Sequence, residues 1–429
     1  MNRCLILLPC VLCVPWLPIA SSAADFESPP TLEAKALAPK DVPLKGEFYA
    51  VDAEVPTDGL LATFTIRSDF GRIEARGPGV LRMRVNEVAA LAELAKIKKS
   101  DVFVNSLKES AASVGGAVAN VVTNTAEVAK AVPASVGRFL ERTARAAKTA
   151  AQKLDDVSQN KEAGAPKGAE AGATTQNVAL AAGVAAGRAT RDILGYDEKR
   201  RELAKQLGVD PYTTNPPLKK ELDDVAWAAF AGGLGVNVLA SAVPGGRLIQ
   251  SSSVVTDWVY EKPPGDLKVW IEKTLKDMGV DQETVDHFLR QKYWTLTTQV
   301  ALVKALEQLK GVDGRVEVLD TAVTAESEDE ARFLALGLSL LAHEHESTPF
   351  ASILGGKPVG MTKDGRAVAT MPLDYVAWTE KVAAFANRED LLPNKPLVMV
   401  TGQLSPTARG ELQKLGWDVK EQVPLAGAF

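Results

Sequence analysis

The chain has 429 residues, of which 46% are hydrophobic, and its 49 basic and 54 acidic side chains give a net charge of −5. A mildly acidic balance argues against general binding to nucleic acids, whose backbone is itself negative. All three cysteines, Cys4, Cys10 and Cys13, stand at the start of the sequence. The remainder of the chain therefore cannot form disulfides, catalytic thiolates or cysteine-type zinc sites.

Residues 1–24 have the three parts of a secretory signal peptide. Arg3 supplies the positive start, residues 4–20 form an apolar segment broken by prolines, and residues 23–24 are small enough for cleavage. No small residue precedes the second or third cysteine, so we expect no lipid-modified cysteine. The sequence therefore predicts an exported protein, located in the periplasm or, as the alternative, outside the cell.

Residues 25–154 are predicted to form an N-terminal unit that begins with an antiparallel β-meander. Three alternating runs separated by turn sequences predict its strands, at residues 48–55, 60–67 and 72–76. The Asp58-Gly59 pair between the first two runs favours a hairpin there. Apolar residues at helical spacing then predict helices over 81–97 and 103–132.

Four basic residues fall on one face of the helix predicted at the end of this unit: Arg138, Arg142, Arg145 and Lys148. A basic amphipathic helix can lie on an anionic membrane surface. The alternative is a solvated charged face on a bundle helix, because the alanines elsewhere on this helix bury little area. This face is the candidate surface for the expected partner, which is an envelope protein or an anionic membrane.

Residues 155–177 lack large apolar groups, which predicts a disordered linker. A helical domain is expected over 178–311, and it contains an uncharged segment at 225–243. The mild hydrophobicity of this segment favours a helix buried on all sides, in which Trp227 and Phe230 supply most of the packing area. Insertion into a membrane is the alternative, because its length is near the ~20 residues that a span needs and small residues recur four apart.

The loop at residues 212–215 precedes this uncharged helix and is rich in hydroxyl and amide groups. Such groups could bind a polar ligand. A turn followed by a helix N-cap at Asn215 and a first-turn proline at Pro216 accounts for the same residues.

Residues 312–429 are predicted to form a small α/β domain. Its strands are expected at 316–321, within a hairpin over 357–371, at 396–401 and at 417–421. Asp374 and Ser405 are expected to cap two of the helices between them. The fold class is therefore α+β and mostly helical, with an N-terminal β-meander, a helical middle and a C-terminal α/β domain.

Two features of the C-terminal domain are candidates for chemistry. His343 and His345 flank Glu344 near a helix end, where side chains two residues apart diverge, so a solvated helix end competes with a metal site. The loop over 401–405 joins a strand to a helix N-terminus, where backbone N–H groups can bind an anion. It lacks the spacing of a P-loop, and we predict neither a bound metal nor a cofactor.

The sequence contains neither G-x-S-x-G nor H-E-x-x-H, and no catalytic residue is assigned. We therefore expect a non-enzymatic envelope protein that binds or scaffolds other components, peripheral to a membrane surface. One alternative is a hydrolase or transferase with its site in the C-terminal domain, and another is membrane insertion through 225–243. A concave pocket that gathers charged groups would favour the enzyme, and an exposed apolar helical face would favour the scaffold.

Overall fold

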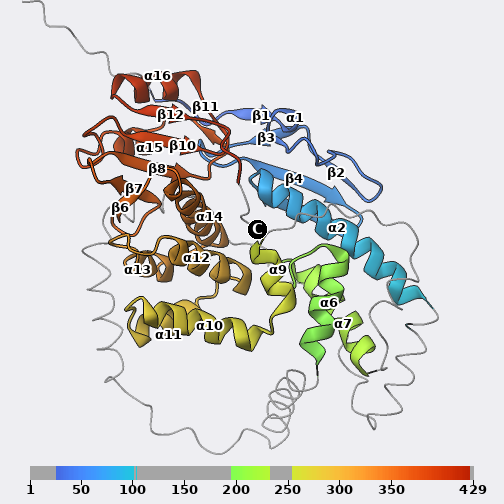
Figure 1. Ribbon diagram of the computed structural model, residues 1–429. Coiled ribbons are helices and arrows are strands. Elements are labelled where there is room, and N and C mark those ends of the chain that lie inside the picture. The colour runs from blue at the N-terminus through green and yellow to red at the C-terminus, as the bar shows by residue number, and fades with distance from the viewer. Residues whose placement is uncertain (1–25, 101–102, 104–194, 232–253, 426–429) are drawn as a thin grey trace, which may run out of the picture.

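The computed structural model describes residues 26–100, 103, 195–231 and 254–425 (Figure 1). The protein is α+β, with an N-terminal sheet region, a helical middle and a C-terminal mixed sheet, which confirms the predicted fold class. Several predicted segments lie outside the described residues: the signal peptide at 1–24, the helix after Phe103, the basic face of Arg138, Arg142, Arg145 and Lys148, the linker at 155–177, and the uncharged segment beyond 231.

Two small antiparallel sheets and one long helix form the N-terminal region. Its elements are β1 (Thr31–Glu33), α1 (Ala34–Leu37), β2 (Tyr49–Val51), β3 (Glu54–Pro56), β4 (Thr63–Ser68), β5 (Gly71–Arg76) and α2 (Pro78–Lys99). β4 and β5 form a hairpin, and β2 pairs with the other edge of β4. Phe64 and Ile66 of β4 are fully buried and share one core with Leu81 and Val85 of α2, which lies across this sheet (Figure 1).

The predicted Asp58-Gly59 hairpin is wrong in part. β3 pairs with β1, and only an isolated bridge joins Thr57 to Ala62. The Asp58 carboxylate instead accepts hydrogen bonds from the N–H groups of Leu60 and Leu61, at 3.0 and 2.8 Å. This local turn directs the chain toward the C-terminal sheet, so the strand expected over 48–55 is divided between two sheets.

The helical middle follows local signals in the sequence closely. Its helices are α6 (Tyr196–Leu207), α7 (Pro216–Ala231), α9 (Val254–Glu261), α10 (Pro264–Asp277), α11 (Gln282–Arg290), α12 (Leu296–Gln308), α13 (Val318–Val323) and α14 (Glu328–His345). Gly208 ends α6 in the left-handed conformation, at φ 62°, which costs glycine little. Asp281, Thr295 and Ser327 each accept a hydrogen bond from an N–H group in the first turn of the helix that follows.

The described part of the uncharged segment lies in α7, where Val225, Ala226, Ala228 and Ala229 are buried. Leu218 and Leu222, earlier in the same helix, are also fully buried, and this helix packs against α2 and α6. Trp227 and Phe230 are half-buried, with their rings 5.6 Å apart. Burial of the uncharged segment on all sides stays a prediction, because its residues beyond 231 lie outside the described ranges. Within the described ranges, no helix is both long and apolar enough to span a membrane.

The C-terminal region contains a five-stranded mixed sheet and a separate two-stranded parallel sheet, formed by the ninth and eleventh strands. Its elements are β6 (Phe350–Ile353), β7 (Val359–Thr362), β8 (Ala367–Met371), β9 (Tyr375–Val376), α15 (Glu380–Ala386), β10 (Leu397–Val400), β11 (Gln403–Leu404), α16 (Pro406–Lys414) and β12 (Asp418–Lys420). The order of the five-stranded sheet is β12-β10-β8-β7-β6, with β8, β10 and β12 parallel and the other pairs antiparallel. The carboxyl ends of the parallel strands face the N-terminal region (Figure 1). Helix α14 packs against β8.

Two predicted elements of this region are wrong. The strand expected at 316–321 is helix α13, because Val318, Leu319 and Ala322 bury one helical face. Asp374 caps no helix: the N–H groups of Asp374 and Ala377 donate to the carbonyls of Leu60 and Gly59, at 3.0 and 2.9 Å. This pairing across the molecule extends the backbone, and Thr379 caps α15 instead.

The largest hydrophobic core runs continuously from α9 through α14 into the C-terminal sheet. It therefore lies on both sides of the boundary predicted between residues 311 and 312. A second core joins α2 to α6 and α7, and a third lies under the N-terminal sheets. Because α2 contributes to the second and third cores, it links the N-terminal region to the helical middle.

Candidate functional site

A pocket of about 440 Å³ opens where the N-terminal region meets the C-terminal sheet. Its walls come from the β5–α2 junction, the first half of α14, and the segments that follow β8, β10 and β12. Charged residues in the wall are Arg76, Arg82, Asp329, Arg332 and Asp374, and apolar ones include Leu37, Leu61, Phe333, Leu336 and Val423. We call this the Asp374 pocket. The carboxyl ends of parallel strands are a frequent place for ligand sites.

Asp374 follows β8 and is only 6% exposed. Its Oδ2 accepts a hydrogen bond from the N–H of Ala62 at 2.9 Å, while Oδ1 receives no hydrogen bond from the described residues. Burial raises the pKa of Asp374 to about 7, and the nearby carboxylates of Asp58 and Asp329 add to the effect. Asp374 can therefore gain or lose a proton near neutral pH.

Arg76 stands between two of these carboxylates. Its Nη2 lies 2.5 Å from Asp58 Oδ2, and its Nε lies 3.3 Å from Asp329 Oδ2. Burial raises the pKa of Asp329 as well, although the charge of Arg76 opposes the shift. A single positive charge, that of Arg76, thus lies among three aspartates and pairs directly with two of them, Asp58 and Asp329. The shortage of positive charge favours the protonated form of the third aspartate, the buried Asp374.

The start of α2 lines the same pocket and presents hydrogen-bond donors. Arg82 pairs with Asp41 through Nη2 at 2.5 Å, but its buried Nε has no hydrogen-bond partner in the described structure. No side chain caps α2, and the N–H groups of Gly79 and Val80 find no acceptor among described residues. A helix N-terminus carries a partial positive charge, so this side of the pocket is electropositive.

The predicted anion loop lies beside the pocket, but its N–H groups are already bonded. Thr401, Gly402 and Gln403 line the pocket, and their N–H groups donate to the carbonyls of residues 371, 373 and 374. A Cβ on Gly402 would lie 1.8 Å from the carbonyl oxygen of Asp374, so glycine is required for this close approach. The loop therefore positions Asp374 and offers no free N–H group to an anion.

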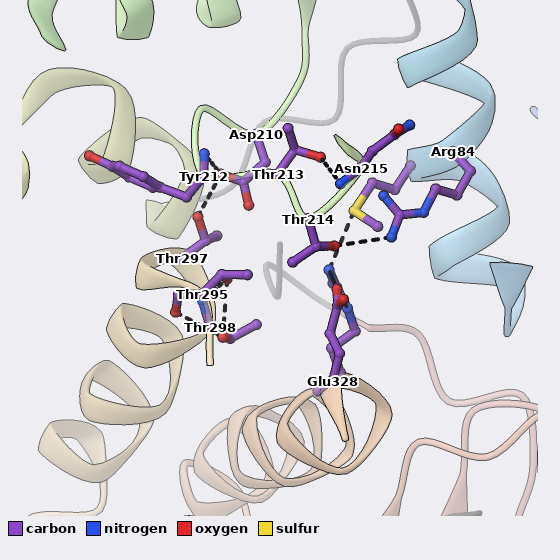
Figure 2. A network of polar contacts seen from close by, with 12 residues as sticks. Arg84, Asp210, Tyr212, Thr213, Thr214, Asn215, Thr295, Thr297, Thr298 and Glu328 are labelled. Atoms are coloured by element: carbon purple, nitrogen blue, oxygen red, sulfur yellow. Dashed lines mark hydrogen bonds and ion pairs between the residues drawn. The ribbon is translucent and has the colours of Figure 1, made fainter. Parts of the chain in front are cut away.

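A second polar cluster involves the loop at 212–215 (Figure 2). Thr213 Oγ1 and Asn215 Nδ2 donate to the two carboxylate oxygens of Glu87, at 2.5 and 2.9 Å. Glu87 is fully buried and also accepts from Arg84 at 2.7 Å, while Arg84 reaches Thr214 at 3.1 Å. The loop therefore binds α2 of its own chain, and its polar groups hold helices together.

The same loop is attached to α12 through Asp210. Its carboxylate accepts from the N–H of Tyr212 at 2.7 Å and from Thr297 Oγ1 at 2.8 Å (Figure 2). Burial raises the pKa of Asp210, and the hydrogen bonds from Tyr212 and Thr297 oppose the shift. Glu328 of α14 pairs with Arg332 at 2.6 Å and completes the cluster. These contacts join α2, α12 and α14 around one loop, behind the pocket wall that Arg332 lines.

The two candidate histidines do not form a site. His345 Nδ1 accepts a hydrogen bond from the N–H of Phe350 at 2.9 Å, and its ring stacks on Phe350. His343 is exposed near the end of α14. Within the described ranges, no group of three or more His, Cys, Asp or Glu side chains is arranged to hold a metal ion.

Sequence reasoning missed Arg76, Arg82, Asp329 and Asp374 as site residues. Their signals are local and weak: Gly77-Pro78-Gly79 marks an uncapped helix start, and Asp374 follows a buried strand. Comparison of the chain with protein-family models, with curated proteins and with solved structures found no match.

Proposed function

We propose that this chain is an exported cell-envelope protein that binds a small molecule in the Asp374 pocket. The observation that carries the proposal is the pocket itself. Its volume of about 440 Å³ falls within the roughly 300–1,000 Å³ of small-molecule sites. Apolar walls with a few convergent polar groups, here Asp374 and Arg82, are the usual composition of such sites.

Export rests on the signal peptide predicted at residues 1–24. A further contact with an anionic membrane or an envelope protein, through the basic face of Arg138, Arg142, Arg145 and Lys148, stays a separate sequence-based proposal. In the described parts of the chain, the exposed large apolar side chains are Phe26 at 57% and Val269 at 66%. The pocket is thus the described feature on which a binding function rests.

Thermal-shift screening of a small-molecule library tests the proposal with a matched pair of glycine variants. Gly79 lines the pocket at the start of α2, and Gly410 stands in α16 away from it; a Cβ at either position meets open space. Gly79→Leu should fill the pocket, whereas Gly410→Leu adds the same side chain elsewhere. We expect ligands that raise the melting temperature of the wild type and of Gly410→Leu but not of Gly79→Leu. Equal shifts in all three proteins would exclude the pocket.

A second candidate function is general acid–base catalysis by a hydrolase or transferase. It is favoured by Asp374, because an acid–base catalyst works best with a pKa near the operating pH, and the pKa of Asp374 is about 7. Asp329 provides a second carboxylate on the same pocket wall. A panel of ester, glycoside and phosphate substrates would test this candidate: activity lost in Asp374→Asn supports it, and activity unchanged in that variant removes it.

A further inference from the structure

The lining of the Asp374 pocket includes several hydrogen-bond donors that have no acceptor among the described residues. Arg82 Nε is buried without a partner among the described residues. The N–H groups of Gly79 and Val80 open α2 without a cap, and both residues line the pocket. Donors of this kind, on a guanidinium and at a helix N-terminus, are typical of sites that bind oxyanions.

Asp374 lies next to Gly77, the residue before α2, and lines the same pocket as these donors, so it supplies an independent indication of a ligand. It is nine-tenths buried, and Oδ1 has no partner in the described structure. A Cβ built on Gly77, the residue before α2, would lie 3.3 and 3.5 Å from the two carboxylate oxygens. The charged groups that face Asp374 are Asp58 from the β3–β4 segment, Arg76 from β5, and Asp329 from α14.

These neighbours determine which form of Asp374 can accompany an anion. Burial, Asp58 and Asp329 raise the pKa of Asp374 to about 7, while Arg76 and the Ala62 N–H oppose the shift. A neutral carboxyl group is a hydrogen-bond donor, and a protonated aspartate in an apolar site can donate to an oxyanion. Protonation thus converts Asp374 from a group that repels an anion into one that binds it.

We propose that the ligand of the Asp374 pocket has an apolar body and an oxyanion head, a carboxylate or a phosphate, and that Asp374 takes up one proton when the head binds. This inference rests on the proposed binding function. The apolar body would contact Leu37, Phe333 and Leu336, which line the same pocket. The proton comes from solvent, and no covalent bond forms or breaks.

A cationic head is the less favourable occupant of the same space. Asp329 and Asp58 are already paired with Arg76, so a ligand cation would have to compete with that guanidinium. It would also leave Arg82 Nε without an acceptor, and an unpaired buried donor costs free energy. An anion satisfies this donor without disturbing an existing pair.

Matched fragments test the head group: benzoate, phenyl phosphate, benzamide and benzylamine, compared by saturation-transfer NMR and by Kd. We expect benzoate or phenyl phosphate to bind more tightly than benzamide, and we expect benzylamine not to bind. Whichever of the two anions has the lower Kd identifies the head group as a carboxylate or a phosphate. Arg82→Gln should weaken anion binding by roughly tenfold or more, the loss expected for a charge-assisted hydrogen bond. Arg67→Gln removes an exposed ion pair with Asp52 outside the pocket and should leave Kd unchanged.

The proton is tested by calorimetry of benzoate, whose carboxylate is ionised at both pH 6 and pH 8.5, in two buffers with different ionisation enthalpies at each pH. For the wild type we expect tighter binding at pH 6, by about tenfold per pH unit at most above the pKa, and uptake of close to one proton at pH 8.5. Asp374→Asn should bind the same fragment with no proton uptake and with a flat pH profile.

The outcomes separate the two proposals. Preferential binding of benzamide or benzylamine, or anion binding without proton uptake, would overturn this inference and leave ligand binding at the pocket intact. Anion binding that Gly79→Leu does not reduce would contradict both, because the ligand would then lie elsewhere on the protein.

Discussion

Asp374 shows how one buried side chain couples the fold to pH. The pKa of Asp374 is about 7 in the folded protein, because of burial first and neighbouring carboxylates second, against an ordinary value of 3.8. The folded state therefore binds this proton more tightly than the unfolded state. The stability contributed by the protonated group is fully present below about pH 4 and is lost as pH rises through 7.

Asp374→Asn should remove this loss, because asparagine is neutral at every pH and its side-chain oxygen can still accept from the Ala62 N–H. We expect the wild type to lose stability between pH 5 and pH 8, by roughly 3 kcal/mol at most, and the variant to lose less. Urea denaturation at both pH values measures the difference. Asp277→Asn, at an exposed position on α10, is the control and should behave as the wild type. Parallel pH profiles for wild type and Asp374→Asn would contradict the assignment.

Gly402 is a second position at which a small change should strongly affect stability, because one added carbon atom would clash with the backbone. In Gly402→Ala the new Cβ would stand 1.8 Å from the Asp374 carbonyl oxygen, which is backbone and cannot move aside cheaply. We expect a loss of at least about 2 kcal/mol of unfolding free energy, because overpacking forces backbone shifts. Gly410→Ala, in open space within α16, should instead stabilise the protein slightly, by roughly 0.5–1 kcal/mol. Thermal denaturation of the two variants side by side measures both effects, and equal melting temperatures would refute the clash.

At the scale of elements, predictions succeeded where the signal is local. The predicted cap at Ser405 accepts a hydrogen bond from the Ala408 N–H, three residues later, and α7 begins at Pro216 as predicted. Predictions failed where the partners are distant. Asp374 precedes apolar residues at helical spacing, yet the carbonyls of Leu60 and Gly59, more than three hundred residues earlier, hold its segment extended.

Burial within helices gives a prediction that compares two phenylalanines. Phe288 of α11 is fully buried, with its ring 5.1 Å from that of Trp294, whereas Phe230 of α7 is half-buried. Phe288→Ala should cost about 3–5 kcal/mol, because it opens a cavity in the largest core. Phe230→Ala should cost clearly less, since solvent already reaches the ring. Chemical denaturation of the two variants measures the loss of unfolding free energy in each. A larger loss in Phe230→Ala than in Phe288→Ala would contradict the burial pattern.

At the scale of the whole molecule, the fold class could be predicted from sequence but the site could not. Periodicity, caps and turns are encoded within short windows, and they specify the three regions in order. Arg76, Asp329 and Asp374 are distant in sequence and meet only because β5 and β8 end where α14 begins. Their charge cluster is a property of the tertiary structure, so no pattern in the sequence marks it.

Contacts across the molecule predict how the chain behaves after cleavage within the linker predicted at residues 155–177. The resulting fragments should stay associated, because buried hydrogen bonds join residues before the linker to residues after it: Glu87 to Asn215, and Ala62 to Asp374. Limited proteolysis followed by size-exclusion chromatography should give two bands on a denaturing gel but one native peak. Separation of the fragments without denaturant would show that these contacts are too weak to hold the halves together.

The bond between Glu27 and the N-cap of α16 has a consequence for the order of events during synthesis. Glu27 Oε2 accepts from Trp378 N–H at 2.6 Å and from Ser405 Oγ at 2.5 Å, partners that are 351 and 378 residues away. A ribosome that adds about 5–20 residues per second needs roughly 20–75 s after it has added Glu27 to reach Ser405. During that interval the N-terminal strands lack the C-terminal surface against which they pack, and a chaperone has time to bind the chain before the two regions come together.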